Sequence, residues 1–92
     1  MKYKLIYTTK FKKDYKLSVK RGMPIELLKK AITLLQNGQP LPANMHDHAL
    51  AGDYIGFREC HILPNWLLIY FVEEDTITLT LSRTGSHSDL FG

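Results

Sequence analysis

Residues 66–72 read Trp-Leu-Leu-Ile-Tyr-Phe-Val and are apolar on both faces that an extended strand would present. A strand that is buried on both faces belongs in the middle of a sheet. The dipeptide Pro64-Asn65 before this run and the acidic stretch 73–75 after it are typical of tight turns. We therefore expect a central strand with one neighbouring strand on each side.

The flanking segments complete a predicted antiparallel meander over residues 56–63, 66–72 and 76–83. In the last of these, Leu79 and Leu81 alternate with threonine, which makes one face apolar and the other polar. Strict alternation would put Arg83 on the apolar face with Leu81. Either a bulge precedes Arg83 or its side chain emerges beyond the end of the strand, and the pattern leaves both possibilities open.

Two helices are predicted before the meander. Residues 3–8 alternate as a strand does, and Thr9 can cap a helix that ends at Gly22. Pro24 then begins a second helix that ends at Gly38. So short a connection predicts an antiparallel helical hairpin that covers the apolar face of the sheet and leaves the other face as an open platform.

The predicted class is α+β, with two N-terminal helices packed on a mainly antiparallel sheet. Residues 39–49 contain two prolines and are expected to form a loop, and residues 50–54 a short strand or a turn. We expect one domain over residues 1–92, because a chain of this length supports one modest core.

From its composition we expect a cytoplasmic protein. The chain has a single cysteine, Cys60, which excludes an internal disulfide and fits a reducing compartment. Its apolar runs are far shorter than the roughly 18 residues of a membrane helix, and its basic N-terminus lacks the apolar region of a signal peptide. Cys60 has no evident base partner, so a thiol nucleophile is not favoured.

Positive charge is concentrated in the first third of the chain. Ten of the 12 Lys and Arg lie within residues 1–30, where two acidic residues oppose them. This asymmetry suits a polyanion such as nucleic acid, although a solvated helix face would look the same. The candidate RNA- and ribosome-binding residues are the lysines of the first predicted helix: Lys10, Lys12, Lys13, Lys16 and Lys20.

The C-terminal half carries groups that suit metal-free RNA cleavage. Such cleavage takes a proton from the ribose 2′-hydroxyl, gives one to the 5′-oxygen, and stabilises charge on the phosphoryl oxygens between them. Each candidate group also has an ordinary structural explanation, and only their combination favours a nuclease. His46 and His48 alone are weak grounds for a metal site. The acid–base candidates are His46, His48, His61, His87, Glu59 and Asp89, with Arg83 as the phosphate ligand.

Four segments of the chain resemble the YafQ-type toxins of the RelE/ParE superfamily, the toxin half of bacterial type II toxin–antitoxin pairs. The last segment is the most suggestive of the four. The segments are Asp47-His48-Ala49-Leu50-Ala51-Gly52, Phe57-Arg58-Glu59-Cys60-His61-Ile62, Pro64-Asn65-Trp66-Leu67-Leu68-Ile69-Tyr70 and Arg83-Thr84-Gly85-Ser86-His87-Ser88-Asp89-Leu90-Phe91.

The resemblance implies a RelE-like microbial ribonuclease fold and an mRNA interferase that cuts mRNA in the ribosomal A site. It implies no metal and no other cofactor. It also implies a cognate antitoxin protein, contact with operon DNA only through that antitoxin, and no membrane partner.

Residue by residue, the resemblance assigns His87 as general acid and Arg83 as phosphate clamp. His48 and His61 become candidates for the base and for orienting the substrate. Asn65 stands where the best-known members carry an acid, and an amide cannot take a proton at neutral pH. The implied catalytic residues are His48, His61, Arg83 and His87, and the implied substrate-binding residues are Asn65, Trp66 and Phe91.

Two other functions remain open at this point. One is a ParE-like toxin that inhibits gyrase by binding it, and the other is a non-catalytic module that binds RNA or the ribosome. Retention of His61, Arg83 and His87 favours the nuclease over the gyrase inhibitor, and the effect of His87→Ala would separate the nuclease from the binding module.

Overall fold

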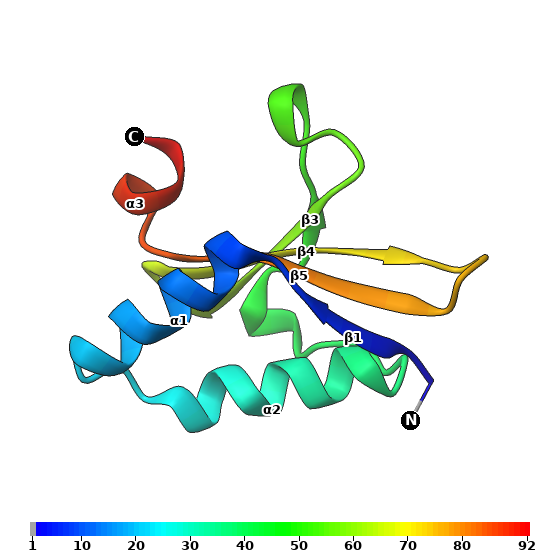
Figure 1. Ribbon diagram of the computed structural model, residues 1–92, viewed down its shortest axis with the longest axis horizontal. Helices are drawn as coiled ribbons and strands as arrows, with labels where there is room; N and C mark the ends of the chain where they lie inside the picture. The colour runs from blue at the N-terminus through cyan, green and yellow to red at the C-terminus, as the bar shows by residue number, and fades with distance from the viewer. Residues whose placement is uncertain (1) are drawn as a thin grey trace.

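A five-stranded sheet in the order β1-β5-β4-β3-β2 forms the middle of the computed structural model, which describes residues 2–92 (Figure 1). β3, β4 and β5 form the predicted antiparallel meander, β2 pairs antiparallel with β3, and β1 pairs parallel with β5. The α+β class and the central place of β4 are confirmed. The strands are β1 (Lys4–Tyr7), β2 (His48–Ala49), β3 (Arg58–Leu63), β4 (Trp66–Glu73) and β5 (Thr78–Gly85).

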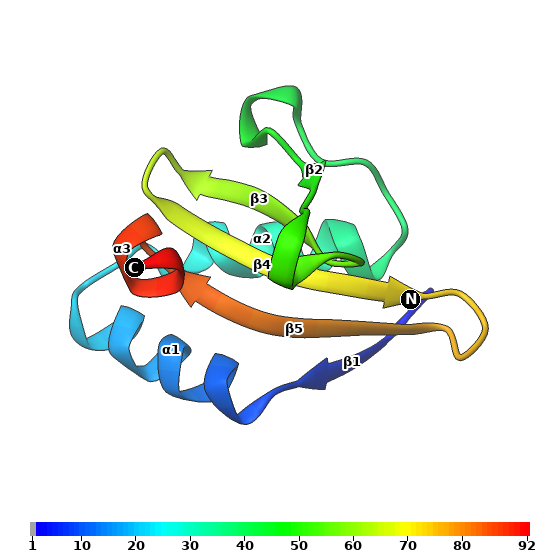
Figure 2. The same ribbon diagram turned by 90° about the horizontal axis from the view of Figure 1, so that it is seen from above.

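Helices α1 (Thr9–Lys20) and α2 (Ile25–Gln36) run in opposite directions, with α2 beneath the sheet and α1 along the edge of β5 (Figures 1 and 2). α1 packs against β5, whereas α2 packs beneath β3. The cap of α1 is Thr8 rather than Thr9, because the Thr8 hydroxyl accepts the Phe11 N–H at 2.9 Å.

The main core lies between these helices and the sheet. Side chains of β3, β4 and β5 that point to the same face meet apolar side chains of α1 and α2, and their burial supplies most of the hydrophobic stabilisation. Its buried members are Tyr3, Phe11, Leu28, Ala31, Leu35, Cys60, Ile62, Trp66, Leu68, Tyr70, Leu79 and Leu81.

The opposite face of the sheet is not the open platform that we predicted. Leu67, Ile69 and Leu90 form a second buried cluster there, with Leu50, Tyr54 and Phe57 packed against it. Leu90 belongs to α3 (His87–Phe91), a helix that the sequence analysis missed. The capping pattern Ser86-x-x-Asp89 was its available signal.

The connection between α2 and β3 is only partly a loop. It contains two short 3₁₀ helices, η1 (Ala43–Met45) and η2 (Gly52–Tyr54), with β2 between them. Residues 50–54 therefore form a turn rather than a strand. β5 begins two residues later than predicted, because Ile77 takes a left-handed conformation (φ 52°) in the preceding turn.

A bulge in β5 decides which way Arg83 points. Tyr70 pairs with Leu81, but the adjacent Ile69 pairs with Arg83, so Ser82 is the extra residue. The bulge reverses the alternation and turns Arg83 to the face that carries Ile69. Of the two possibilities that the sequence left open, the bulge is the one observed.

In the part of the chain that the structure describes, the helices are too short or too polar to cross a lipid bilayer.

Candidate active site

One row of paired residues runs across four strands on the face opposite α2 and the main core. His48 of β2 pairs with Glu59 of β3, Glu59 pairs with Ile69 of β4, and Ile69 pairs with Arg83 of β5. Directly paired residues point to the same side of a sheet, and each step between strands is about 4.8 Å. The backbone of Arg83 is therefore roughly 10 Å from that of Glu59.

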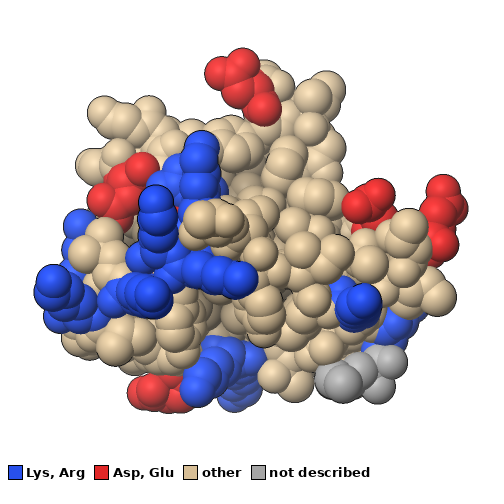
Figure 3. All heavy atoms as spheres, viewed as in Figure 1, with Lys and Arg blue, Asp and Glu red and all other residues tan. Residues whose placement is uncertain are grey.

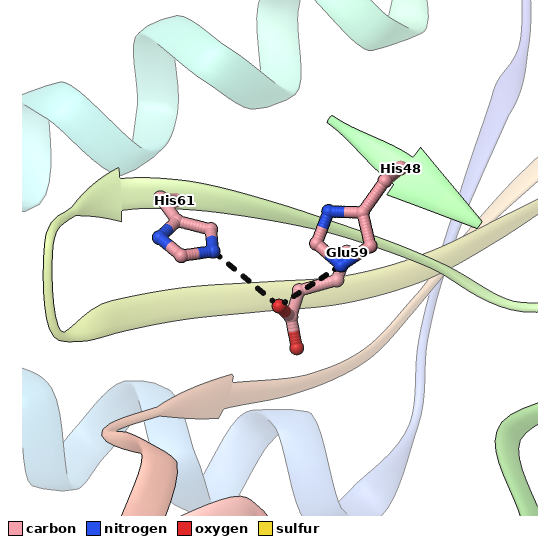
Figure 4. Close-up of side chains that lie close together, drawn as sticks. All are labelled: His48, Glu59 and His61. Atoms are coloured by element: carbon pink, nitrogen blue, oxygen red, sulfur yellow. Dashed lines mark ion pairs between the residues drawn. The ribbon is translucent and has the colours of Figure 1, made fainter. Parts of the chain in front are cut away.

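Glu59 lies between two histidines (Figure 4). Its Oε1 is 3.5 Å from Nε2 of His48 and 3.5 Å from Nε2 of His61, and its side chain is only 6% exposed. The sequence analysis weighed Glu59 only as one acid among several, although it alternates onto the same face as His61.

The tautomer of His48 follows from its second contact. Nδ1 of His48 lies 2.6 Å from the carbonyl oxygen of His46, and because a carbonyl only accepts, Nδ1 donates its proton. When the ring is neutral, Nε2 therefore holds the lone pair and faces Glu59. This arrangement prepares His48 to take up a proton at Nε2.

Asp47 lies between His46 and His48 in the sequence and anchors the loop that carries them. Its carboxylate accepts the Tyr70 hydroxyl at 2.5 Å and the Arg58 Nη2 at 3.2 Å. The hydrogen bond to Asp47 raises the pKa of Arg58, and burial chiefly raises the pKa of Tyr70. Both groups therefore keep their protons at neutral pH and hold the loop in place.

His87 is held by Asn65. The amide oxygen of Asn65 accepts the His87 backbone N–H at 3.0 Å and lies 2.8 Å from Nδ1 of the ring. A backbone N–H can only donate, so the Asn65 atom is the oxygen and Nδ1 is the protonated nitrogen. Asn65 thus orients His87 without being ionised, whereas the sequence analysis had assigned Asn65 to substrate binding.

The four histidines lie in one group. The His61 ring centroid is 5.7 Å from that of His46, 6.2 Å from that of His48 and 5.8 Å from that of His87. Within residues 2–92 the His87 ring is hydrogen-bonded through Nδ1 alone. Three elements distant in sequence therefore bring four titratable rings to one face.

Arg83 shares the face of these residues through its register but is held by Asp14 of α1. Its Nε is 2.6 Å and its Nη2 is 3.2 Å from the two oxygens of Asp14. The Asp14 hydrogen bonds raise the pKa of Arg83 further, so the guanidinium stays charged. Asp14 was not among the predicted site residues, since nothing in its sequence neighbourhood points to Arg83.

Trp66, which the sequence analysis placed among the substrate-binding residues, is a core residue in the structure. It is 1% exposed and packs in the core between the sheet and the helices, so its ring cannot stack on a base. Phe91, in contrast, is 50% exposed and lies edge-on to Tyr54, with ring centroids 5.5 Å apart. A ring held in this way and open on one side can stack on a nucleobase.

The five lysines predicted to bind RNA or the ribosome are all exposed. Figure 3 shows Lys and Arg side chains gathered over α1. The helix therefore presents a basic surface to solvent.

Three side chains offer metal ligands at a common point. The candidate donor atoms of His48, Glu59 and His61 lie within 4.8 Å of one another. Two imidazoles and a carboxylate suit a divalent transition metal such as Zn²⁺. The sequence analysis had identified only the pair His46 and His48. Cys60 is no candidate ligand or nucleophile, because burial raises the pKa of its thiol to about 12.

The chain is similar to known bacterial toxins over nearly its whole length. A family model described as "Bacterial toxin of type II toxin-antitoxin system, YafQ" matches residues 3–92. The mRNA interferase toxin YafQ of Escherichia coli K12 is 42% identical over 87 residues, which cover 94% of this chain and 92% of that protein.

Two solved structures are similarly close. The E. coli DinJ–YafQ toxin–antitoxin complex matches with a TM-score of 0.90 at 40% identity and covers 100% of both chains. A metal-bound toxin from Helicobacter pylori matches with a TM-score of 0.91 at 43% identity, covering 97% of this chain and 99% of that one. The chain therefore belongs to the YafQ family of bacterial toxins of type II toxin–antitoxin systems.

Proposed function

We propose that this protein is an mRNA interferase, an endoribonuclease that arrests translation by cutting mRNA in the ribosomal A site. The observation that carries the proposal is the position of His87 against His61, with ring centroids 5.8 Å apart, next to the His48–Glu59 pair. The similarity of this protein to an mRNA interferase toxin over 94% of the chain supports the same activity.

His48 serves as the general base in this proposal. Its Nε2 takes the proton of the ribose 2′-hydroxyl as O2′ forms a bond to phosphorus. Glu59 then lies 3.5 Å from the imidazolium and stabilises its charge. His61, between His48 and His87, contacts the phosphoryl oxygens.

His87 serves as the general acid. In its protonated form Nε2 gives a proton to O5′ as the P–O5′ bond breaks, which leaves a 2′,3′-cyclic phosphate and a 5′-hydroxyl end. Arg83 binds the phosphoryl oxygens, on which negative charge increases in the transition state. Phe91 stacks on a neighbouring base. None of these steps requires a metal ion.

The partners follow from the charge distribution and from the relatives. The exposed lysines of α1 bind ribosomal RNA, and the reaction takes place in the cytoplasm. Because a related toxin is solved in complex with the antitoxin DinJ, a cognate antitoxin covers this toxin until it is released. Operon DNA is reached only through that antitoxin.

A leaving-group experiment tests the assignment of acid and base. We would measure cleavage of ribosome-bound mRNA that carries sulfur in place of O5′ at the scissile linkage, since a thiolate leaves without a proton. His87→Ala should slow cleavage of normal mRNA by about a hundredfold to ten-thousandfold but cleave the sulfur substrate nearly as fast as the wild type. His48→Ala should be slow on both substrates.

Two outcomes would contradict the proposal. Growth arrest by His87→Ala with intact mRNA would indicate toxicity by binding alone. Equal slowing of His87→Ala on both substrates would show that His87 is not the acid.

A further inference from the structure

Asp14 of α1 binds three N–H groups of β5. Its Oδ2 accepts from Arg83 Nε at 2.6 Å and from the Thr84 backbone N–H at 3.1 Å, and its Oδ1 accepts from Arg83 Nη2 at 3.2 Å. The pairing of β1 with β5 ends at Tyr7 and Leu81, and α1 covers the edge of β5 beyond that point (Figure 2). Asp14 therefore accepts the hydrogen bond of a backbone N–H at the sheet edge and holds Arg83 at the same time.

Asp14 takes up one edge of the guanidinium, and Tyr54 is a second neighbour of Arg83 that also raises its pKa. Asp14 contacts the edge formed by Nε and Nη2, whereas the edge formed by Nη1 and Nη2 can still donate two parallel hydrogen bonds. Such an edge matches two oxygens of a phosphate group. Fixing the side chain before RNA arrives removes the entropy that a free arginine would lose on binding.

We propose that Asp14 is a positioning residue that directs the Nη1–Nη2 edge of Arg83 at the scissile phosphate. The proposal rests on the nuclease function proposed above and adds a residue of α1 to its machinery. α1, which carries the basic surface, thus also sets the geometry of the phosphate ligand.

A second contact ties α1 to the element that carries His87. Arg21, seven residues after Asp14 and so about two turns further along the same side, has its Nη1 2.8 Å from Asp89 Oδ2. Arg21, with the backbone of Ser86, lowers the pKa of Asp89 to about 2, so this carboxylate stays charged. Asp89 also completes the capping box of α3. One side of α1 therefore contacts both Arg83 and α3.

The opposite expectation is that Asp14 weakens the site by neutralising Arg83. The two hypotheses differ in the sign of the effect of Asp14→Asn. If Asp14 positions Arg83, kcat falls about tenfold to a hundredfold, because displacing a catalytic group by about 1 Å has effects of this size. KM stays the same or falls, since the guanidinium keeps its charge and loses a competing anion.

The kinetic experiment compares Asp14→Asn with the wild type on ribosome-bound mRNA, with Glu26→Gln, at an exposed position of α2, as the matched control. Asparagine keeps an oxygen for the Thr84 N–H, so the variant should fold. In an Arg83→Lys background, Asp14→Asn should change kcat less than about twofold, because lysine has no second edge to direct.

An experiment without RNA tests the positioning itself. The Arg83 Nε–H should give a slowly exchanging NMR signal in the wild type and lose that protection in Asp14→Asn. If the wild type cut no mRNA, the proposed function would fail, while this signal would still show whether Asp14 holds Arg83.

Two kinetic results would overturn the proposal. An increase in kcat for Asp14→Asn would make Asp14 an inhibitory group. If kcat were unchanged in Asp14→Asn while Arg83→Gln was severely slowed, Asp14 would serve only to accept the backbone N–H at the sheet edge.

Discussion

The two faces of the sheet bury different kinds of side chain. The face under α1 and α2 buries aromatic and aliphatic groups such as Trp66 and Tyr70 in one continuous core. The opposite face has a smaller apolar cluster, and next to it a carboxylate side chain, that of Glu59, which is 6% exposed. Burying a carboxylate costs free energy that apolar burial does not. The first face thus stabilises the fold, and the second retains an unfavourable group for chemistry.

The largest effect that we expect is on the helix-covered face. Trp66→Ala should lower the free energy of unfolding by about 3–5 kcal/mol, because it empties a large buried volume. Urea denaturation measures the change.

Trp66→Phe is the matched variant for function. Within residues 2–92 the indole Nε1 has no hydrogen-bond partner, so phenylalanine removes none and should keep kcat within about twofold of the wild type. If a folded Trp66→Phe protein lost more than about tenfold in cleavage rate, Trp66 would be part of the substrate site after all.

The second prediction concerns Glu59 on the opposite face. Glu59→Gln should lower kcat at neutral pH by about tenfold to a hundredfold, because the imidazolium formed at His48 loses its counter-charge. The free energy of unfolding should stay the same or rise, since an amide costs less to bury than a carboxylate. Single-turnover cleavage and urea denaturation measure both quantities.

The reverse pattern for Glu59→Gln, with stability lost and cleavage kept, would make Glu59 a structural group. The contrast between the two faces would then disappear.

The contrast between the faces also explains what the sequence could predict. The strands, the helices and the core of β4 follow from hydrophobic periodicity, which reports burial directly. Periodicity failed at Arg83, because the bulge at Ser82 shifts the alternation by one residue. It also gave no indication of α3, whose five residues are too few for a helical pattern.

The site was predictable in its residue types but not in its contacts. Histidines and an arginine in one small chain indicate acid–base chemistry on a phosphate, and the family resemblance gave them roles. The partners Asp14 and Glu59 are ordinary acids in sequence and are selected only by the fold, across 69 residues for Asp14 and Arg83.

A third, smaller effect is expected at Asn65. Asn65→Asp would place a charge beside Nδ1 of His87 in the same geometry. A carboxylate favours the protonated imidazole, so the acid form should persist as pH rises, and the high-pH limb of the rate profile should move up by about one unit. Asn65→Ala removes the group that orients His87, so this variant should instead cleave mRNA more slowly than the wild type at every pH. Identical profiles for the wild type and the Asn65→Asp variant would show that His87 donates no proton.

The smallest expected effect is that of a chelator. His48, Glu59 and His61 can hold a metal, and a similar toxin is metal-bound, yet the proposed base needs the His48 lone pair that a metal would occupy. Cleavage by protein treated with EDTA should therefore match that of untreated protein when ribosomes and their Mg²⁺ are restored equally to both. If the rate fell on chelation and returned with Zn²⁺, the buried carboxylate would be a metal ligand instead of a counter-ion. The cost of burying Glu59 would then be offset by metal binding rather than by the protonation of His48.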